Sequence, residues 1–493
     1  MKVKRLHLQN YGRFEDLKID FAPTAEKTGN VTVIVGNNGA GKSQILQALA
    51  TSLSWFVLKL VRDTDGFEID KTLIRNGEND VKVNIIVDFG ENNPTPYGPV
   101  EDAHWTISNV KDGRINSFSR SIKELKKTVR NFRSNLTSKD GLSLPIVSFY
   151  PVDRGVNSTF MEISKNFVSD QLTAYENALE SSVSFESFFA WFREREDVEN
   201  EKSRTIQNLA SDEIKESNRL IHSSLALLEK NKERLNAETD QTENEKLIKT
   251  LNRLIELRNY GTEQIKQGIS ITDRSLEGVR RSIKRFINFE NVHIRRQGSP
   301  TMIVEKNGEE LDVNQLSQGE KSLLALVGDI ARRLALLNPS LDNPLEGEGV
   351  VMIDEVDLHL HPKWQHDLID KLVKTFPNVQ FILTTHSPHV ISDRNDILLY
   401  SLDDGELNEM PNVYGEDVNT VLTKIFDVDI RDSEVEKQFT IIRRAISNHD
   451  YSIAESNIEQ LAEKLPPDHL ELLKCRLLLA QAKLTDEPRH AED

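Results

Sequence analysis

Gly36-Asn37-Asn38-Gly39-Ala40-Gly41-Lys42-Ser43 is the stretch that decides the fold of this 493-residue chain. It fits the phosphate-loop pattern G-x-x-x-x-G-K-[ST]. The β-branched run 31–35 before it indicates a buried strand, and the run 44–50 after it indicates a helix. In a strand–loop–helix unit, backbone N–H groups and the start of the helix surround a polyphosphate. We therefore expect Lys42 to hold the β- and γ-phosphates of ATP and Ser43 to ligate Mg²⁺.

The composition indicates a globular chain of two or three domains. Of its residues, 38% are hydrophobic and 29% are charged. One cysteine, Cys475, excludes an intrachain disulfide and fits a reducing compartment. The N-terminus runs directly into a strand pattern, and no uninterrupted apolar run approaches the roughly 20 residues that span a membrane. We expect a cytoplasmic protein without a membrane partner.

The charge balance leaves nucleic acid open as a partner. A net charge of −17 argues against a protein that coats DNA, but a local basic patch would be enough to bind it. Two basic runs are candidates, KELKKTVRNFR at 123–133 and RRSIKRFINFENVHIRR at 280–296. A solvated helix face is the preferred interpretation of the first run, and the second is balanced between the two interpretations. DNA is therefore a candidate partner.

The first half of the chain alternates between strand and helix patterns. Alternation over 3–21 predicts a hairpin, and 81–89, 103–109 and 144–150 predict further strands. From about residue 171 the period becomes helical. Apolar residues at three- and four-residue steps, interrupted by a polar run at 237–244, predict an antiparallel helical hairpin. Each arm would reach about 40–45 Å at about 1.5 Å per residue.

The second half carries three more motifs in order. The first is Leu316-Ser-Gln-Gly-Glu-Lys321, which continues into an expected amphipathic helix at 323–337. The second is an apolar strand, 349–353, that ends in Asp354-Glu355, and the third is a strand, 379–385, that ends in His386. The last part, about 415–493, is helical with tetratricopeptide-like spacing. Because it holds fewer than three repeats, we expect it to dock on something.

This order of motifs resembles the ABC-type ATPases of the SMC and DNA-repair branch, over about residues 1–60 and 286–400. The resemblance implies an α/β fold: an ABC-type P-loop ATPase head, with a mixed sheet flanked by helices and an antiparallel β subdomain, a short helical-hairpin insertion and a helical C-terminal tail. The expected division is an N-terminal lobe at 1–190, the hairpin at 191–285, a C-terminal lobe at 286–405 and the tail at 406–493.

The resemblance also implies roles for single residues. Lys42, Glu355 and His386 would be catalytic: Glu355 would orient or deprotonate the attacking water, and His386 would contact the γ-phosphate. Ser43 and Asp354 would hold Mg²⁺. The implied ATP-binding residues are Gly36, Asn37, Asn38, Gly39, Ala40, Gly41, Lys42, Ser43, Gln44, Ser317, Gln318, Gly319, Glu320 and Asp357. In the family, the signature residues 317–320 act from the opposite subunit, so that ATP joins two heads. Gln318 stands where the family more often has glycine, which leaves the rate of hydrolysis open.

Some positions keep alternative interpretations. The Q-loop residue is left open between the stretch 150–154 and Gln171. The pair His359 and His361 invites a metal site, but i, i+2 spacing without cysteine or a third ligand is a weak pattern. A structured loop that leads into a helix near Pro362 is preferred. Taken singly, Asp354-Glu355 could be a solvated strand end.

The DEVDLHLHPKWQ segment at 354–365, the short insertion and LPIVSFYPVDR at 144–154 resemble the compact ATPases of anti-phage defence operons. One group of these carries a C-terminal Toprim nuclease, but here only about 90 helical residues follow the last ATPase strand, and Asp427-Val-Asp429 is interpreted as a loop. The layout is most similar to the Septu ATPases (PtuA). That resemblance implies a homo-oligomer and a separate HNH-type nuclease as partner. Two alternatives stay open: a DNA-repair ATPase that works as an ATP-gated clamp, and a nucleotide-dependent scaffold without turnover.

Overall fold

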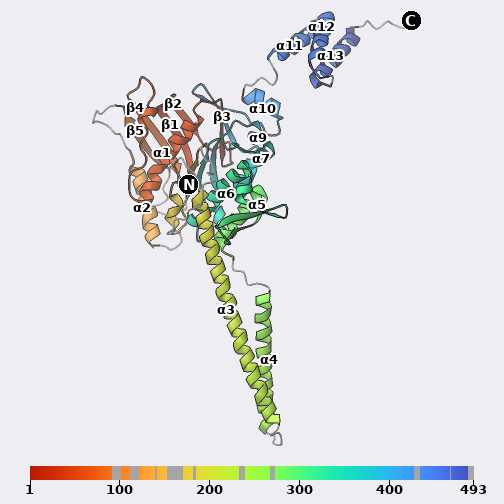
Figure 1. Ribbon diagram of the computed structural model, residues 1–493. Coiled ribbons are helices and arrows are strands. Elements are labelled where there is room, and N and C mark those ends of the chain that lie inside the picture. The colour runs from red at the N-terminus through yellow and green to blue at the C-terminus, as the bar shows by residue number, and fades with distance from the viewer. Residues whose placement is uncertain are drawn as a thin grey trace. The chain divides into compact units, whose positions relative to one another are not determined.

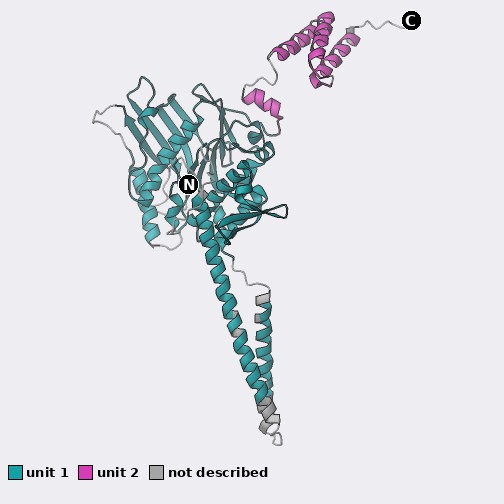
Figure 2. Ribbon diagram, in the orientation of Figure 1, with its two compact units in different colours: residues 1–414 teal, residues 415–493 magenta. Residues whose placement is uncertain are grey.

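The computed structural model describes residues 1–90, 102–111, 121–138, 142–152, 170–180, 185–232, 239–266, 272–392, 394–426, 433–466 and 468–486. These residues form two compact units, 1–414 and 415–493, and each is described here by itself (Figure 2). The four-part division expected from the sequence, with boundaries after residues 190, 285 and 405, remains a prediction.

A six-stranded sheet forms the core of the first unit (Figure 1). Its order is β13-β12-β3-β11-β10-β6, and all neighbours are parallel except the edge strand β13. The strands are β3 (Val31–Gly36), β6 (Ile146–Tyr150), β10 (Gly349–Ile353), β11 (Val379–Thr384), β12 (Leu398–Asp403) and β13 (Glu406–Glu409). Every residue of β3, β6, β10 and β11 is buried, which is why these strands appear in the sequence as continuous apolar runs. The mixed sheet expected from the sequence is confirmed.

Helix α1 (Lys42–Val61) follows β3 and packs on this sheet. By length and composition α1 could cross a membrane, but 78% of its most apolar window is buried inside the unit. A core helix passes the same test, and the burial identifies α1 as one. Its apolar length is explained by the sheet and helices around it.

A separate four-stranded antiparallel sheet has the order β2-β1-β4-β5. Its strands are β1 (Lys2–Tyr11), β2 (Phe14–Asp20), β4 (Asp80–Asp88) and β5 (Ala103–Val110), which confirms the predicted hairpin and the two strands after it. Helix α2 (Lys123–Ser138) packs against α1 and β5. The rings of Phe56, Phe89 and Phe132 meet at this junction, with centroids 5.1–6.0 Å apart. The antiparallel sheet is thereby tied to α1.

Helices α3 (Phe185–Lys232) and α4 (Thr239–Lys266) form the predicted helical hairpin (Figure 1). The predicted turn at 237–244 is wrong in position, because α4 already begins at Thr239. Thr, Asp and Glu are also typical of the first turn of a helix, so the polar run fitted both interpretations. The predicted arm length holds for α4, at about 42 Å, whereas the 48 residues of α3 span about 72 Å at about 1.5 Å per residue. Part of α3 belongs to the head, where Phe188 and Trp191 are buried.

Ion pairs fix the root of α3 to the rest of the head. Glu196 and Glu199 are 4% and 8% exposed. Arg280 contacts both carboxylates, at 3.3 and 2.9 Å, and Arg296 contacts Glu196 at 2.8 Å.

Two further cations of the basic run 280–296 are paired on the surface, Lys284 with Glu290 and Arg295 with Glu310. The run considered above as a DNA surface is therefore largely compensated by carboxylates.

Helix α6 (Gln318–Leu337) is buried almost throughout, and not amphipathic as expected from the sequence. Asp329 pairs with both Arg332 and Arg333 and compensates part of their charge, with the carboxylate 2.7 and 2.6 Å from the two guanidinium groups. This compensation allows a helix with charged residues to occupy the interior. The remaining elements of the first unit are α5 (Arg274–Ile287), β7 (Glu290–Arg295), β8 (Thr301–Lys306), β9 (Glu309–Asp312), α7 (Pro362–His366), α8 (Leu368–Thr375), α9 (Pro388–Ile391) and the 3-10 helices η1 (Lys71–Leu73), η2 (Gln171–Tyr175), η3 (Val313–Gln315) and η4 (Pro344–Glu346).

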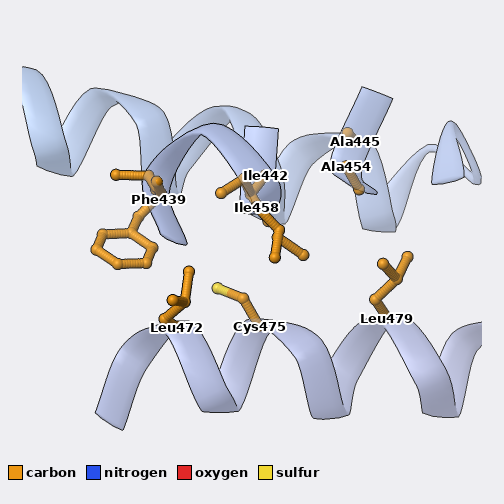
Figure 3. Packing of buried hydrophobic residues seen from close by; sticks show 9 residues of the cluster. Phe439, Ile442, Ala445, Ala454, Ile458, Leu472, Cys475 and Leu479 are labelled. Carbon is orange, nitrogen blue, oxygen red and sulfur yellow. The ribbon is translucent and has the colours of Figure 1, made fainter. Parts of the chain in front are cut away.

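The second unit is helical, as predicted. It contains α10 (Val418–Ile425), α11 (Ser433–Ser447), α12 (Tyr451–Lys464) and α13 (Leu470–Asp486). Helices α11, α12 and α13 share a small core that includes Phe439, Ile458 and the buried Cys475 (Figure 3). The helices break near Asn448 and Pro466, where the sequence places turn residues. The predicted loop at Asp427-Val-Asp429 lies outside the described residues.

Candidate functional site

The loop between β3 and α1 needs glycine at two positions for steric reasons. A Cβ on Gly36 would lie 2.1 Å from the carbonyl oxygen of Leu402, and a Cβ on Gly41 would lie 2.6 Å from Cζ of Phe14. Both glycines also have positive φ, 151° and 108°. Gly41 caps α1 without a side-chain hydrogen bond, so the first N–H groups of α1 are available to an anion. The backbone of the loop thus fits a phosphate group.

Lys42 is the first residue of α1, and its side chain reaches back to the start of this loop. Its side chain is buried, and Nζ donates to the carbonyl oxygens of Gly36 at 2.8 Å and Asn37 at 3.1 Å. Burial lowers the pKa of Lys42, and the carboxylates of Asp354, Glu355 and Asp357 oppose that shift. The ammonium group is therefore held by the loop itself, in the position the phosphate-loop pattern predicts.

His386 follows β11 and contacts Lys42, which follows the neighbouring strand β3. The Lys42 ammonium has only protons to donate, so the contact of 2.8 Å requires His386 Nε2 to accept and Nδ1 to carry the proton. Burial lowers the pKa of His386, the positive charge of Lys42 lowers it further, and nearby carboxylates oppose the shift. The structure brings these two predicted residues together, with the imidazole in its neutral form.

Asp354 and Glu355 are positioned by Thr384, a residue that the sequence analysis missed. The Thr384 hydroxyl donates to Asp354 Oδ1 and accepts the backbone N–H of Glu355 at 2.8 Å. The N–H of Asp354 donates to the carbonyl oxygen of Tyr150 at 2.8 Å. Glu355 has a positive φ of 45°, which is uncommon outside glycine, and the hydroxyl of Thr384 holds this turn in place. One signal could have found Thr384: parallel neighbours β10 and β11 end at the same sheet edge, so polar residues ending both strands should meet.

Asp357 and the two histidines after it belong to a structured loop. Asp357 accepts a hydrogen bond from the Thr385 hydroxyl, and its carbonyl oxygen accepts the N–H of Leu360 at 3.0 Å. His361 Nδ1 accepts the N–H of Lys363 at 3.3 Å and so caps α7. Among the described residues, no group of three or more His, Cys, Asp or Glu side chains could hold a metal ion. The turn hydrogen bond and the cap match the structured loop that the sequence predicts to lead into a helix near Pro362.

The signature residues open helix α6 through a capping box. Ser317 Oγ donates to Glu320 Oε2 at 2.8 Å and accepts the N–H of Glu320 at 3.4 Å. Lys306 contacts the same carboxylate at 2.6 Å. Burial alone would raise the pKa of Glu320, but the hydrogen bonds from Lys306 and Ser317 lower it. Glu320 is thus kept ionised while Gln318 and Ser317 remain exposed at the start of the helix.

Gly319 joins this signature to the loop after β10. A Cβ on Gly319 would lie 2.4 Å from the carbonyl oxygen of His359. Among the hydrogen bonds of the described residues, none links the segment 317–320 to the phosphate loop 36–43. Within this chain, the structure brings together Lys42 and His386, and separately the signature and the loop that follows Glu355.

The turn between β1 and β2 also contacts the phosphate loop. The sequence analysis did not predict this contact. Arg13 donates a hydrogen bond from Nη1 to the carbonyl oxygen of Gly39. A Cβ on Gly12 would lie 2.4 Å from Gln44 Oε1, and this buried oxygen has no hydrogen-bond partner among the described residues. A buried acceptor without a partner beside Ser43 fits a site that is completed by a ligand. Ser43 itself is exposed at the start of α1.

The two candidate Q-loop positions lie in different surroundings. Tyr150 ends β6, and its hydroxyl donates to Asp329 of α6 at 2.9 Å; residues 153 and 154 of that stretch lie outside the described residues. Gln171 donates to the carbonyl oxygens of Leu142 at 2.5 Å and Leu337 at 2.8 Å. Gln171 is therefore committed to bonds within the head, whereas Tyr150 connects directly to Asp354.

Comparisons with known proteins identify relatives of this chain. A family model described as AAA ATPase domain matches residues 1–391. The chain is 35% identical over 446 residues to "Retron Ec83 probable ATPase" of Escherichia coli, which covers 88% of this chain and 78% of that protein. It is 28% identical over 173 residues to "Septu protein PtuA" of Bacillus thuringiensis, covering 33% and 42%. Among solved structures, the Smc head domain from Pyrococcus furiosus matches with a TM-score of 0.43 at 18% identity, over 83% of this chain and 96% of that one.

Proposed function

We propose, from the premise that this chain belongs to the AAA ATPase domain family, that its ATP cycle controls a separate nuclease in defence against phage. The chain is an ATPase of the SMC-like type, and its relatives include retron and Septu proteins. Control of an HNH-type nuclease, and the oligomer in which it occurs, are the new parts of this statement. The observation that carries it is the joining of Lys42, His386, Asp354 and Glu355 at one edge of the sheet, alongside close similarity to the retron protein.

The residues at this edge divide the work of phosphoryl transfer. Lys42 and the N–H groups at the start of α1 would hold the phosphates, and the neutral His386 would contact the γ-phosphate. Mg²⁺, which prefers one or two carboxylates together with phosphate oxygens, would be held by Ser43 and Asp354 and would neutralise developing charge. Glu355 would orient the attacking water. Thr384 would fix the two carboxylates relative to each other.

Head-to-head assembly is proposed from the exposed start of α6. Ser317 and Gln318 are exposed, and the helix N-terminus there offers a partial positive charge. Within this chain the segment 317–320 makes no hydrogen bond to the phosphate loop among the described residues, so a second copy would have to bring it to ATP. ATP would then connect two heads, and the helical second unit would offer a further contact for an oligomer or the nuclease.

The test uses Glu355→Gln, because it removes the carboxylate but leaves the phosphate loop unchanged. Mass photometry would compare the parent and the variant with and without ATP, alone and with any HNH-type protein encoded beside it. We expect ATP to produce a multimer that persists in Glu355→Gln and captures the nuclease. If Glu355→Gln hydrolysed ATP at the same rate as the parent, the catalytic assignment of Glu355 would be overturned. A chain that changes only between monomer and ATP-bound dimer and ignores the nuclease would favour the DNA clamp.

A further inference from the structure

Helix α2 carries a basic face that is not explained by the ATPase site. Four exposed cations recur at three- and four-residue steps, which places them on one side of the helix. We call them the α2 basic face; they are Lys123, Lys126, Lys127 and Arg130. On the other side, Leu125, Val129 and Phe132 are buried against the head. The helix is held by its apolar side and presents its charges outward.

These cations have no carboxylate partners among the described residues. Two other charged residues of α2 are already engaged, since Arg133 contacts Asp63 at 3.3 Å and Glu124 contacts His104 at 2.9 Å. The other basic run, 280–296, is largely compensated by Glu196, Glu199, Glu290 and Glu310. In a chain with a net charge of −17, the α2 basic face is thus a local region of the opposite sign.

The composition of this face selects the kind of polyanion. Among the described residues, no large hydrophobic side chain of α2 is exposed. A helix that lies on a membrane needs an apolar side to insert, and here that side is buried in the head. Single-stranded nucleic acid is usually bound with aromatic residues that stack on bases, and the α2 basic face has none. Cations accompanied by the small polar residues Ser134 and Thr137 match a phosphate backbone.

We propose that the α2 basic face binds the phosphate backbone of double-stranded nucleic acid. From Lys123 to Arg130 the helix rises about 10 Å, which matches about three phosphates along one strand of a duplex. The binding is independent of base sequence, because backbone contacts carry no sequence information. Helix α2 packs on the C-terminal half of α1, where Phe132 meets Phe56 and Arg133 contacts Asp63, whereas the phosphate loop precedes the other end of α1.

The test measures binding of the full-length chain to a fluorescein-labelled DNA duplex of about 30 base pairs by anisotropy over a range of KCl concentrations. One variant replaces all four residues of the α2 basic face with glutamine. The matched control removes the same number of charges from the other run: Arg281→Gln, Lys284→Gln, Arg285→Gln and Arg295→Gln. We expect the first variant to bind roughly 10- to 100-fold more weakly and to lose about 3 from the salt slope, at about 0.9 per phosphate contact. The control should stay within about twofold of the parent.

The following binding results would overturn the proposal. A parent that does not bind the duplex at low salt, or two variants weakened equally, would exclude a local duplex-binding face. If the parent binds phosphatidylserine vesicles, the fourfold variant loses that binding, and neither protein binds the duplex, the α2 basic face would be a membrane surface instead. If the fourfold variant aggregates, Lys126→Gln/Lys127→Gln should still lose about half of that change in slope. All assays omit ATP and nuclease, so this proposal and the proposed function fail separately.

Discussion

Replacing Thr384 with valine should slow ATP turnover far more than it weakens ATP binding. Valine keeps the shape of the fully buried threonine but removes the hydroxyl, which donates to the carboxylate of Asp354 and accepts the N–H of Glu355. A hydrogen bond to a charged group contributes about 1.5–3 kcal/mol and one to a backbone N–H about 1 kcal/mol. The sum predicts a loss of roughly 2.5–4 kcal/mol, divided between the free energy of unfolding and the orientation of Glu355. We expect kcat to fall at least about tenfold, while KM changes less than about threefold.

The assay combines steady-state hydrolysis over ATP and Mg²⁺ concentrations with urea unfolding. Thr384→Ser keeps the hydroxyl and loses only a methyl group, so it should retain most of kcat. A valine variant with parental kcat and parental stability would refute the assigned role of Thr384. Equal damage in the serine and valine variants would show that packing of the methyl group, and not the hydroxyl, is what matters.

Three further perturbations test other parts of the head. Gly319→Ala places a Cβ 2.4 Å from the carbonyl oxygen of His359, so a loss of about 1–3 kcal/mol in unfolding free energy and a lower kcat are expected; unchanged values would show that the contact can relax. Asp329, whose pKa is lowered to about 2 by two buried guanidinium groups that outweigh burial, gives stability that is complete above its unfolded pKa of about 4 and is lost as pH falls toward 2. Asp329→Asn should therefore cost about 3–5 kcal/mol at pH 7 in urea unfolding, and the cost should shrink as pH falls through 4 toward 2; equal stability at pH 7 would contradict the pairing. The lowered pKa of His386 means that stability is lost as pH falls below about 6.5 through the folded value, and His386→Gln should remove that part of the pH dependence of unfolding.

The phosphate loop and the strands around it could be predicted because their signals are local. A β-branched run, a glycine loop and an apolar helix lie within 31 consecutive residues, 31–61. The order of the later motifs placed Asp354 and His386 at strand ends, and the structure puts them there. The boundary between the hairpin turn and α4 could not be predicted, since the first turn of α4 has the same polar composition as a loop.

Pairing between distant residues could not be predicted. Thr384 lies 30 residues from Asp354, and Glu196 lies 84 residues from Arg280. A sequence pattern gives the charge of a side chain but not the position of its partner, so the run 280–296 looked as exposed as the run 123–133. The same limit explains α6, whose charges suggested an outer face although Asp329 pairs with Arg332 and Arg333 inside.

The position of β3 between β11 and β12 has a consequence for synthesis of the chain. β3 carries the phosphate loop at its end, yet both of its neighbours are encoded about 350 residues later. At about 5–20 residues per second, the ribosome needs roughly 20–70 s to deliver them. Until then the buried strand Val31–Gly36 has no sheet to join, and its unpaired edges are open to aggregation. A nascent chain can therefore complete its nucleotide pocket only after translation has passed residue 403. We expect chaperones to bind the early strands during expression until then.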